Sequence, residues 1–287
     1  MKGIILAGGH GTRLYPLTKY ISKQLLPIYD KPMIFYPLST LMLAGIDDIL
    51  LISTSKDIQK YKEVLGTGKT FGISIQYAVQ DDPRGIAESF IIGKDFIKKD
   101  SVALILGDNV FYGAELTNKL RSRSKDIDGA CIFACQVSNP SQFGILKFNK
   151  SGHVIKVIEK PDKPPSNYAV TGLYFYDNDV INYASKLKPS ARNELEITDI
   201  NNLYLKDKNL SIEKLGRGFS WLDTGTPDSL LEASIFVQIL EKRQGIKIAC
   251  LEEIALKNGW IDKKQINQNI RKNNYNSSYS NYLKKLL

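Results

Sequence analysis

Three closely spaced glycines after an apolar segment are the first residues whose types and spacing suggest chemistry. The apolar segment reads as a short buried strand, and Gly8, Gly9 and Gly11 follow it. Because glycine has no Cβ atom, such a loop can bring its backbone amides close to phosphate oxygens. Arg13 and Lys23 add positive charge beside the loop. The pattern predicts a nucleotide-handling site.

Two better-known phosphate motifs do not fit this chain. A dinucleotide fingerprint needs a third glycine where Leu14 stands. Residues 68–70 (Gly-Lys-Thr) imitate the end of a Walker A loop, but Glu63 occupies the place of that loop's first glycine. The segment also follows a predicted helix instead of a strand, so we interpret it as a turn. A dehydrogenase and a P-loop ATPase are both disfavoured.

Two aspartates that follow short apolar segments are candidates for a second part of the site. Asp108 comes after residues 102–107, and Asp223 comes after Trp221 and Leu222. In open α/β sheets, ligands bind in the crevice beyond the carboxyl ends of the strands. Two carboxylates from distant segments suit a hard cation such as Mg²⁺ that bridges substrate phosphates. Taken alone, each aspartate is read more simply as a turn or capping residue.

The elements that would position these residues alternate in type along the first half of the chain. We expect strands at residues 2–7, 48–53, 73–79, 102–106 and 130–136. We expect helices at residues 32–44, 56–65, 87–97 and 115–125. This alternation is typical of a mostly parallel sheet that helices cover on both faces.

The second half of the chain has a different pattern of predicted strands and helices. Longer strands are expected at residues 144–148, 153–159 and 169–176. Helices are expected at residues 227–241, 252–257 and 263–272, the first of them opened by an N-cap threonine and a proline. Residues 272–281, rich in Asn, Ser and Tyr, are interpreted as a loop before a final helical turn at residues 282–287.

Composition limits the class of protein. The 287 residues are 43% hydrophobic and 24% charged, which is ordinary for a globular chain. The net charge of +9 comes from scattered lysines without any nucleic-acid-binding motif, so small anions are the expected partners and nucleic acid is not. No apolar run approaches the ~20 residues of a membrane helix, and no signal-peptide pattern opens the chain. Cys131, Cys135 and Cys250 suggest neither disulfides nor zinc, so we expect a cytoplasmic location.

A series of ordered motifs resembles those of the sugar-1-phosphate nucleotidylyltransferases, and most closely the short glucose-1-phosphate thymidylyltransferases. The likeness runs in register from residue 1 to about residue 262. It rests on residues 8–16 (GGHGTRLYP), 22–33 (SKQLLPIYDKPM), 106–109 (LGDN), 159–161 (EKP), 194–199 (ELEITD) and 218–226 (GFSWLDTGT). So many motifs in one order are far more specific than a single glycine loop.

The resemblance implies a Rossmann-like α/β fold, known as the nucleotide-diphospho-sugar transferase fold. This fold has a mixed, mostly parallel open sheet with helices on both faces, plus C-terminal helices. The implied core covers residues 1–241, with a nucleotide-binding half at about 1–137 and a sugar-binding half at about 138–241, and a helical region covers 242–287. A homotetramer is also implied, with feedback by a downstream sugar nucleotide such as dTDP-rhamnose near residues 244–255.

The implied reaction is attack by a sugar-1-phosphate oxygen on the α-phosphorus of a nucleoside triphosphate, with release of pyrophosphate. From dTTP and α-D-glucose 1-phosphate it gives dTDP-glucose, the entry step of dTDP-L-rhamnose and dTDP-deoxysugar biosynthesis. The nucleophile is already anionic, so alignment and charge neutralisation must supply the catalysis without a general base. Within the class the alternative is a UTP-using or base-promiscuous enzyme, and outside it a non-catalytic nucleotide-sugar sensor.

The resemblance assigns roles to individual residues, in three sets. The catalytic set, in which the two aspartates bind Mg²⁺, is Arg13, Lys23, Asp108, Lys160 and Asp223. The nucleotide-binding set, in which the two glutamines read the base, is Gly8, Gly9, Gly11, Thr12, Arg13, Gln24, Gln80 and Gly85. The set for the sugar phosphate is Gly144, Glu159, Lys160, Val170, Tyr174 and Arg192.

Several residues depart from the family pattern. His10 replaces a small hydroxyl residue, and its side chain either adds charge beside the triphosphate when protonated or faces solvent. Arg84 stands where an acid is frequent, which leaves thymine-over-uracil preference open, and Phe143 stands where tyrosine is common. Asn193 replaces a frequent glycine, for which the sequence offers no physical reason. Trp221 is expected to pack as core beneath the site.

Overall fold

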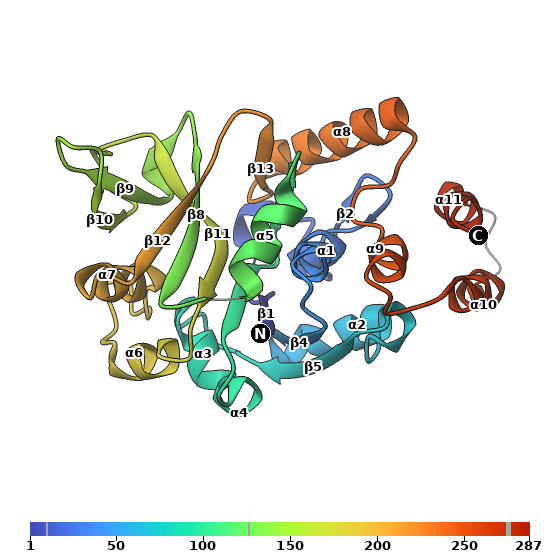
Figure 1. The fold of residues 1–287 in the computed structure, drawn as a ribbon, viewed down its shortest axis with the longest axis horizontal. Helices are drawn as coiled ribbons and strands as arrows, with labels where there is room; N and C mark the ends of the chain where they lie inside the picture. The colour runs from blue at the N-terminus through green and yellow to red at the C-terminus, as the bar shows by residue number, and fades with distance from the viewer. Residues whose placement is uncertain (10, 126, 274–276) are drawn as a thin grey trace.

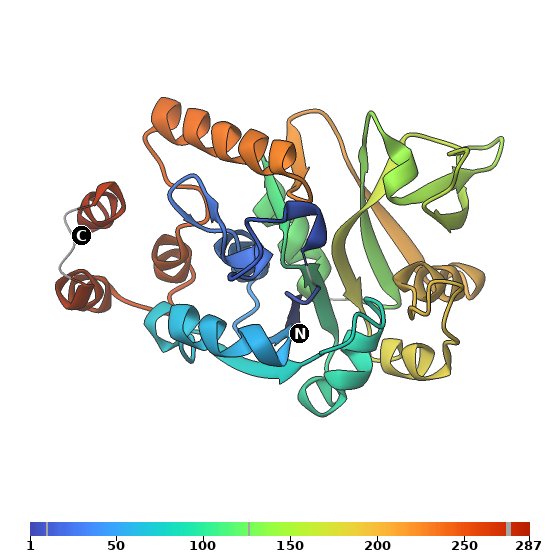
Figure 2. The same cartoon turned by 180° about the vertical axis from the view of Figure 1, so that it is seen from behind.

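A twisted nine-stranded sheet runs through the molecule, with helices on both of its faces (Figure 1 and Figure 2). The computed structural model describes residues 1–9, 11–125, 127–273 and 277–287. The parallel part of the sheet has the order β6-β1-β4-β5, formed by β1 (Lys2–Leu6), β4 (Asp48–Ser53), β5 (Ser74–Val79) and β6 (Val102–Leu106). β1, β4 and β6 are short apolar runs because helices bury them from both sides.

The other part of the sheet mixes strand directions. β11 (Tyr168–Tyr176) lies antiparallel to β6 and to β8 (Ala130–Gln136). β9 (Gly144–Phe148) and β10 (Val154–Glu159) extend the sheet beyond β11, and β12 (Leu210–Leu215) adds parallel to β8. The predicted mixed sheet is therefore confirmed. β12 was not predicted, because most of its residues are only partly buried and it has no continuous apolar run.

Neighbouring residues of β1 face opposite layers of helices. Ile5 belongs to a buried cluster with residues of α1 (Phe35–Leu43), α2 (Ser55–Leu65), α5 (Leu116–Lys125) and α9 (Leu251–Lys257). Since successive side chains of a strand point to opposite faces, the residue before it must pack on the other side of the sheet.

The second layer lies on that other side. Ile4 belongs to a cluster with residues of α3 (Glu88–Ile92), α4 (Lys94–Ile97), α6 (Val180–Lys186) and α7 (Ile197–Lys206). Neither α6 nor α7 was predicted, because each packs only one face and its partners lie far along the chain. The two clusters together account for the helices seen on the two faces of the sheet in Figure 1 and Figure 2.

The predicted helix over residues 87–97 is in fact two helices that meet at Gly93. A Cβ atom at Gly93 would lie 2.9 Å from the carbonyl oxygen of Ser89 and 3.0 Å from the Ile4 side chain. The chain therefore passes directly over the sheet at this point and changes direction there.

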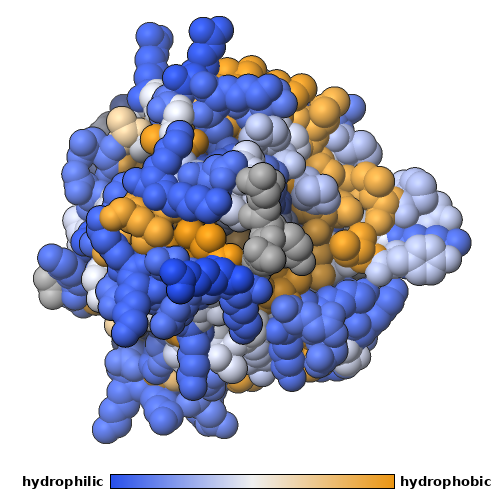
Figure 3. Space-filling view, turned by 90° about the vertical axis from the view of Figure 1, so that its right-hand side faces the viewer, coloured by the Kyte–Doolittle hydropathy of each residue, from blue (hydrophilic) through white to orange (hydrophobic). Residues whose placement is uncertain are grey.

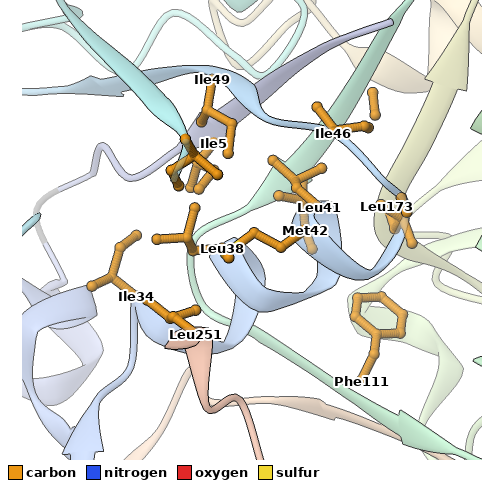
Figure 4. Close-up of a cluster of buried hydrophobic side chains, with 14 of the residues drawn as sticks. Ile5, Ile34, Leu38, Leu41, Met42, Ile46, Ile49, Phe111, Leu173 and Leu251 are labelled. Carbon is orange, nitrogen blue, oxygen red and sulfur yellow. The ribbon is translucent and has the colours of Figure 1, made fainter. Parts of the chain in front are cut away.

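α1 is the central helix of the first cluster. Figure 4 shows Leu38 and Leu41 of α1 lying below Ile5 and Ile49 of the sheet. Pro37 lies in the first turn of the helix, where backbone N–H groups have no helical partner, so the proline does not interrupt it. The helix therefore starts at Phe35, and the predicted start at residue 32 was too early.

Two predicted turns are confirmed. Gly45, with a φ of 81°, follows the last turn of α1. The segment 68–70 lies in a tight turn after α2, where Gly68 has a φ of 82° and begins a short 3-10 helix. The Walker-like residues therefore do not follow a strand, as a P-loop requires.

Two small sheets and a long helix complete the core. β7 (Asn109–Gly113) pairs antiparallel with β13 (Phe219–Asp223), and β2 (Pro27–Ile28) pairs with β3 (Lys31–Pro32). α8 (Pro227–Gln244) follows β13 and begins with the predicted N-cap threonine, whose side chain accepts a hydrogen bond from a backbone N–H.

The chain closes with a pair of helices, α10 (Lys263–Asn273) and α11 (Ser278–Lys284). The predicted loop over residues 272–281 is therefore wrong at both ends, and its centre, residues 274–276, lies outside the described residues. α11 starts early because Ser277 caps it, accepting a hydrogen bond from Ser280 N at 3.1 Å. Tyr279 then donates to Glu252 of α9 at 2.6 Å, which holds α11 against the core.

The face that carries these last helices is largely hydrophilic, with apolar patches between its polar side chains (Figure 3). Among the described residues, no helix is long and apolar enough to cross a membrane.

Candidate active site

Strand pairing brings the two predicted metal-binding aspartates together. In the β7–β13 pair, Asp223 lies opposite Asn109, the residue directly after Asp108. Thr224 Oγ1 donates a hydrogen bond to the carbonyl oxygen of Asp108 at 2.9 Å and fixes the two segments to each other. Both aspartates line one cavity of about 760 Å³, which we call the main cavity. It lies beyond the carboxyl end of β6, where the sequence predicted it.

Three cations surround this pair of carboxylates. Lys23 Nζ lies 2.5 Å from Asp108 Oδ2, and the Lys23 side chain is only 8% exposed. Burial raises the pKa of Asp223, and the negative charge of Asp108 raises it further. Lys23, Arg13 and Lys160 lower the pKa of Asp223, so all three lie close enough to act on its charge.

Arg13 reaches the pair because the chain has no side chain at Gly225. A Cβ atom at that position would lie 2.9 Å from Arg13 Nη2 and 3.3 Å from Asp223 Oδ2. Glycine therefore leaves the room in which the guanidinium lies beside the carboxylate. Arg13 itself follows the glycine loop, in a short 3-10 helix, Thr12–Leu14.

The two aspartates fit a divalent cation of the Mg²⁺ type. Within the described residues, no group of three His, Cys, Asp or Glu side chains converges on a metal site. Mg²⁺ is commonly bound by one or two carboxylates while substrate phosphates and waters complete its shell. A hard, two-carboxylate donor set at the edge of a large cavity meets that description, whereas a zinc cage with four protein ligands does not.

The glycine loop borders two smaller hollows beside the main cavity. Gly9, with a φ of 97°, lines both. One hollow, of about 200 Å³, also contains Lys23 and Lys56. Gly11 and Thr12 lie outside the linings of these two hollows and of the main cavity in the described part of the chain, and His10 lies outside the described residues.

The second hollow contains both predicted base-reading glutamines, and we call it the glutamine hollow. Its volume is about 230 Å³, and it shares Asp108 with the main cavity. It is lined by Leu6, Gly8, Gly9, Gln24, Gln80, Pro83, Gly85, Ile86, Leu106, Asp108 and Glu194. Five residues of the predicted nucleotide-binding set, Gly8, Gly9, Gln24, Gln80 and Gly85, therefore line one hollow.

Gly85 is required by a close approach between two loops. Its φ is 101°, and a Cβ atom there would lie 2.4 Å from the carbonyl oxygen of Leu195. Leu195 N donates to the carbonyl oxygen of Arg84 at 2.7 Å. This contact joins the loop after β5 to the loop that carries Arg192.

The main cavity is also lined by the residues predicted to hold the sugar phosphate. Those lining it are Gly144, Glu159, Lys160, Val170, Tyr174 and Arg192. Glu159 accepts a hydrogen bond from Thr198 at 2.6 Å, which orients its carboxylate. Burial raises the pKa of Tyr174, so its hydroxyl stays protonated. Phe143, the departure from tyrosine, also lines the main cavity.

Arg192 is held by carboxylates. Its Nη2 lies 2.8 Å from Glu196, 3.3 Å from Glu159 and 3.5 Å from Glu194. Sequence reasoning missed Glu194 and Glu196 as partners, although both stand in a motif that it quoted. The neighbouring Asn193 has a φ of 59°, and asparagine adopts this left-handed region more readily than other non-glycine residues. This geometry explains why asparagine is tolerated there.

Asn109 is the most important residue that the sequence analysis missed. It is buried, and its Oδ1 accepts hydrogen bonds from Trp221 Nε1 at 2.6 Å and Gly172 N at 3.1 Å. Its Nδ2 donates to Asp108 at 2.9 Å. The feature of the sequence that could have identified Asn109 is its position directly after Asp108. Trp221 packs against the core as predicted, but it also lines the main cavity.

A family model described as nucleotidyl transferase matches residues 2–239. The chain therefore belongs to the nucleotidyl transferase family, in agreement with its mixed sheet and with the charged cavity beyond β6.

Its relatives are more specific. The chain is 55% identical over 287 residues to the glucose-1-phosphate thymidylyltransferase of Neisseria meningitidis, covering 100% of this chain and 99% of the relative. It is 55% identical to the enzyme of that name from Mycobacterium tuberculosis, over the same shares of each chain. A Bacillus anthracis protein named as a glucose-1-phosphate thymidylyltransferase, solved with a sucrose, is 42% identical with a TM-score of 0.76, covering 82% of this chain and 94% of that one.

A more distant solved structure is similar in fold alone. A UDP-glucose pyrophosphorylase in complex with UDP-glucose is 24% identical with a TM-score of 0.73. The comparison covers 84% of this chain and 98% of that one. The nucleotide-diphospho-sugar transferase fold is thereby confirmed.

Proposed function

We propose that this protein is a glucose-1-phosphate thymidylyltransferase, which converts dTTP and α-D-glucose 1-phosphate into dTDP-glucose and pyrophosphate. Relatives of that name match the chain over its full length at 55% identity. The observation that carries the proposal is the convergence of two carboxylates and three cations at one end of the main cavity. A site that joins two polyanions needs this arrangement, since charge repulsion is the main barrier.

On the nucleotide side, the base lies between Gln24 and Gln80 in the glutamine hollow. The triphosphate runs from there along the glycine loop toward Arg13 and Lys23. Arg13 neutralises charge that develops on the leaving pyrophosphate, and Gly225 leaves its guanidinium free to do so. Gly11 and Thr12 support this loop from outside the hollows.

On the sugar side, Lys160 and Arg192 hold the phosphate of glucose 1-phosphate. Glu159, oriented by Thr198, accepts hydrogen bonds from sugar hydroxyls. Gly144, Val170 and Tyr174 shape the wall against which the sugar ring lies.

Asp108 and Asp223 are the residues that would hold a Mg²⁺ ion. When bound, the ion neutralises negative charge on the phosphates that must approach each other. Lys23 keeps the Asp108 carboxylate oriented, and Asn109 fixes it from the other side. No residue takes a proton, because the attacking phosphate oxygen is already anionic.

This assignment divides the core as the sequence suggested. Residues 1–137 carry the nucleotide side, residues 138–241 carry the sugar side, and residues 242–287 form a helical region. The three free thiols suit a reducing, cytoplasmic setting.

The assay is pyrophosphate release with dTTP, UTP and other triphosphates against glucose 1-phosphate. We expect release with dTTP, and the ratio between dTTP and UTP measures base choice. Asp108→Asn and Asp223→Asn are each expected to lower kcat by about 10³-fold or more, whereas Glu232→Gln, an exposed acid on α8, is the matched control. A folded protein that releases no pyrophosphate with any pair would instead be a sensor of sugar nucleotides.

A homotetramer with feedback by a product further along the pathway also belongs to this proposal. Leu231, Ile235 and Ile239 are exposed at four-residue spacing on α8, which gives an apolar face that a second copy could cover. A separate hollow of about 300 Å³ includes residues 246–250 and the side chain of Glu253. Light scattering tests the assembly, and inhibition by dTDP-rhamnose, lost in Glu253→Lys but kept in Glu232→Lys, tests the second site.

A further inference from the structure

The side-chain amide of Gln80 has a fixed orientation. Its Nε2 donates to Glu88 Oε2 at 2.7 Å and to the carbonyl oxygen of Gly85 at 3.2 Å. A carboxylate and a carbonyl can only accept hydrogen bonds, so both partners demand the nitrogen. Gln80 is only 8% exposed, which leaves its amide little freedom to turn.

The oxygen of that amide therefore faces the glutamine hollow. A Cβ atom at Gly8 would lie 3.4 Å from Gln80 Oε1, and Gly8 lines the same hollow. Gln80 presents a hydrogen-bond acceptor to whatever lies there.

Gln24 is arranged in the opposite sense. Its Oε1 accepts hydrogen bonds from Ser22 Oγ at 2.9 Å and from the Tyr61 hydroxyl at 3.1 Å. Burial raises the pKa of Tyr61, so the phenol keeps the proton that it donates. With its oxygen engaged, Gln24 has its Nε2 left to donate into the hollow.

We propose that Glu88 is a positioning residue that sets the base specificity of this enzyme, by holding the Gln80 amide with its oxygen toward the nucleobase. This inference rests on the proposed function. Glu88 lies behind Gln80 and touches no substrate, and its other carboxylate oxygen is only loosely engaged, 3.9 Å from the largely exposed Arg84. Its main partner is the Gln80 amide.

The pattern of one acceptor and one donor selects among pyrimidines. Thymine and uracil carry an N3–H donor next to the O4 acceptor, which complements Gln80 Oε1 and Gln24 Nε2. Cytosine has the reverse pattern, a bare N3 next to an N4 amino donor. If the Gln80 amide could turn, its nitrogen would meet the cytosine N3 and the discrimination would weaken.

The test compares three deoxynucleotides that differ only in the base. We would measure kcat/KM for dTTP and dUTP, and the inhibition constant of dCTP against dTTP, in the wild type, Glu88→Gln and Glu88→Leu. The wild type should bind dTTP about 10–100-fold more tightly than dCTP. Glu88→Leu should lower this ratio about fivefold to tenfold, and Glu88→Gln, which keeps an acceptor without the charge, should lower it about threefold.

The ratio of kcat/KM for dTTP to kcat/KM for dUTP is the internal control, since both bases present the same edge to the two glutamines. It should stay within about twofold in every variant. Glu63→Leu, an exposed glutamate on α2, controls for the loss of a surface carboxylate, and thermal melts confirm folding.

The outcomes separate the two proposals. If the wild type uses dTTP but the preference for dTTP over dCTP is the same in both Glu88 variants as in the wild type, Glu88 does not position the amide and the inference is wrong. A parallel loss for all three nucleotides would also overturn it, because that is the result of general disorder. If the wild type transfers no thymidylyl group at all, the proposed function fails instead.

Discussion

The glutamine hollow and the main cavity meet at Asp108 but are prepared for their ligands in different ways. In the glutamine hollow, neutral amides are tied to partners that leave one defined polar atom of each facing inward. In the main cavity, opposite charges are paired with each other, as Lys23 is with Asp108 and Arg192 with Glu196. The glutamine hollow is therefore preorganised for its ligand. In the main cavity, the substrate phosphates of the proposed reaction would meet cations that are already paired with carboxylates.

The comparison predicts that losing a charge in the main cavity affects turnover more than any change in the hollow. After the two aspartates, the largest effect is expected from Arg13→Ala, which removes the guanidinium beside Asp223. We expect kcat to fall by about 10²–10³-fold, with the melting temperature unchanged. The exposed Arg217→Ala is the control, and a kcat within twofold of the wild type would show that Arg13 does not act on the reaction.

The next largest effect is expected on the binding of glucose 1-phosphate. Arg192→Met should raise KM for glucose 1-phosphate about tenfold to 100-fold and leave KM for dTTP unchanged. Part of this loss is repulsion, because Glu159, Glu194 and Glu196 would then face the sugar phosphate without their cation. Steady-state kinetics with each substrate varied in turn checks this, with Lys188→Met as control. Equal effects on both substrates would contradict the division of the site.

A smaller effect is expected from Gly225→Ala. The added methyl group would lie 2.9 Å from Arg13 Nη2, at the end of a flexible side chain, so the guanidinium can move and the fold stays intact. We expect kcat to fall about tenfold and stability to stay near the wild type. Gly216→Ala, at a position with open space around it, is the matched control. Full activity in Gly225→Ala would mean that the exact place of Arg13 is unimportant.

The smallest effect is on stability. Burial, and then the charge of Asp108, raise the pKa of Asp223, so folding disfavours its ionised form. The protein therefore loses stability as the pH rises from below the usual aspartate pKa of 3.8 through the raised value. Asp223→Asn avoids this loss. Without divalent cations, it should melt a few degrees above the wild type at neutral pH, and the difference should vanish at about pH 3. A lower melting temperature at neutral pH would contradict the argument.

The sequence predicted those parts of the fold in which burial alone determines the structure. β4, β6, β8 and β9 have the predicted bounds, because each is a run whose residues suit a buried strand. β12 and α7 were missed because their stability comes from one packed face and from partners far along the chain. The long helix over residues 87–97 was predicted as continuous because the contact of Gly93 with the sheet is invisible in sequence.

The residues of the candidate site also fall into those that the sequence predicted and those that it did not. Asp108, Asp223 and the two glutamines stand in recognisable motifs, and the structure brings them together. Asn109 and Glu88 were missed because their roles depend on atoms that other segments supply. Asn109 bridges three elements, and Glu88 matters only through Gln80. Spacing along one chain cannot reveal a residue that acts through a neighbour in space.

The pairing of β7 with β13 has a consequence for how such enzymes can diversify. The main-chain ladder that sets Asp223 beside Asn109 fixes the spacing of the two acids whatever the side chains between them are. The long stretch of chain between the two strands supplies much of the lining of the main cavity, including Gly144, Glu159 and Arg192. Substitutions or insertions in this stretch can therefore change the lining of the cavity while Asp108 and Asp223 keep their separation.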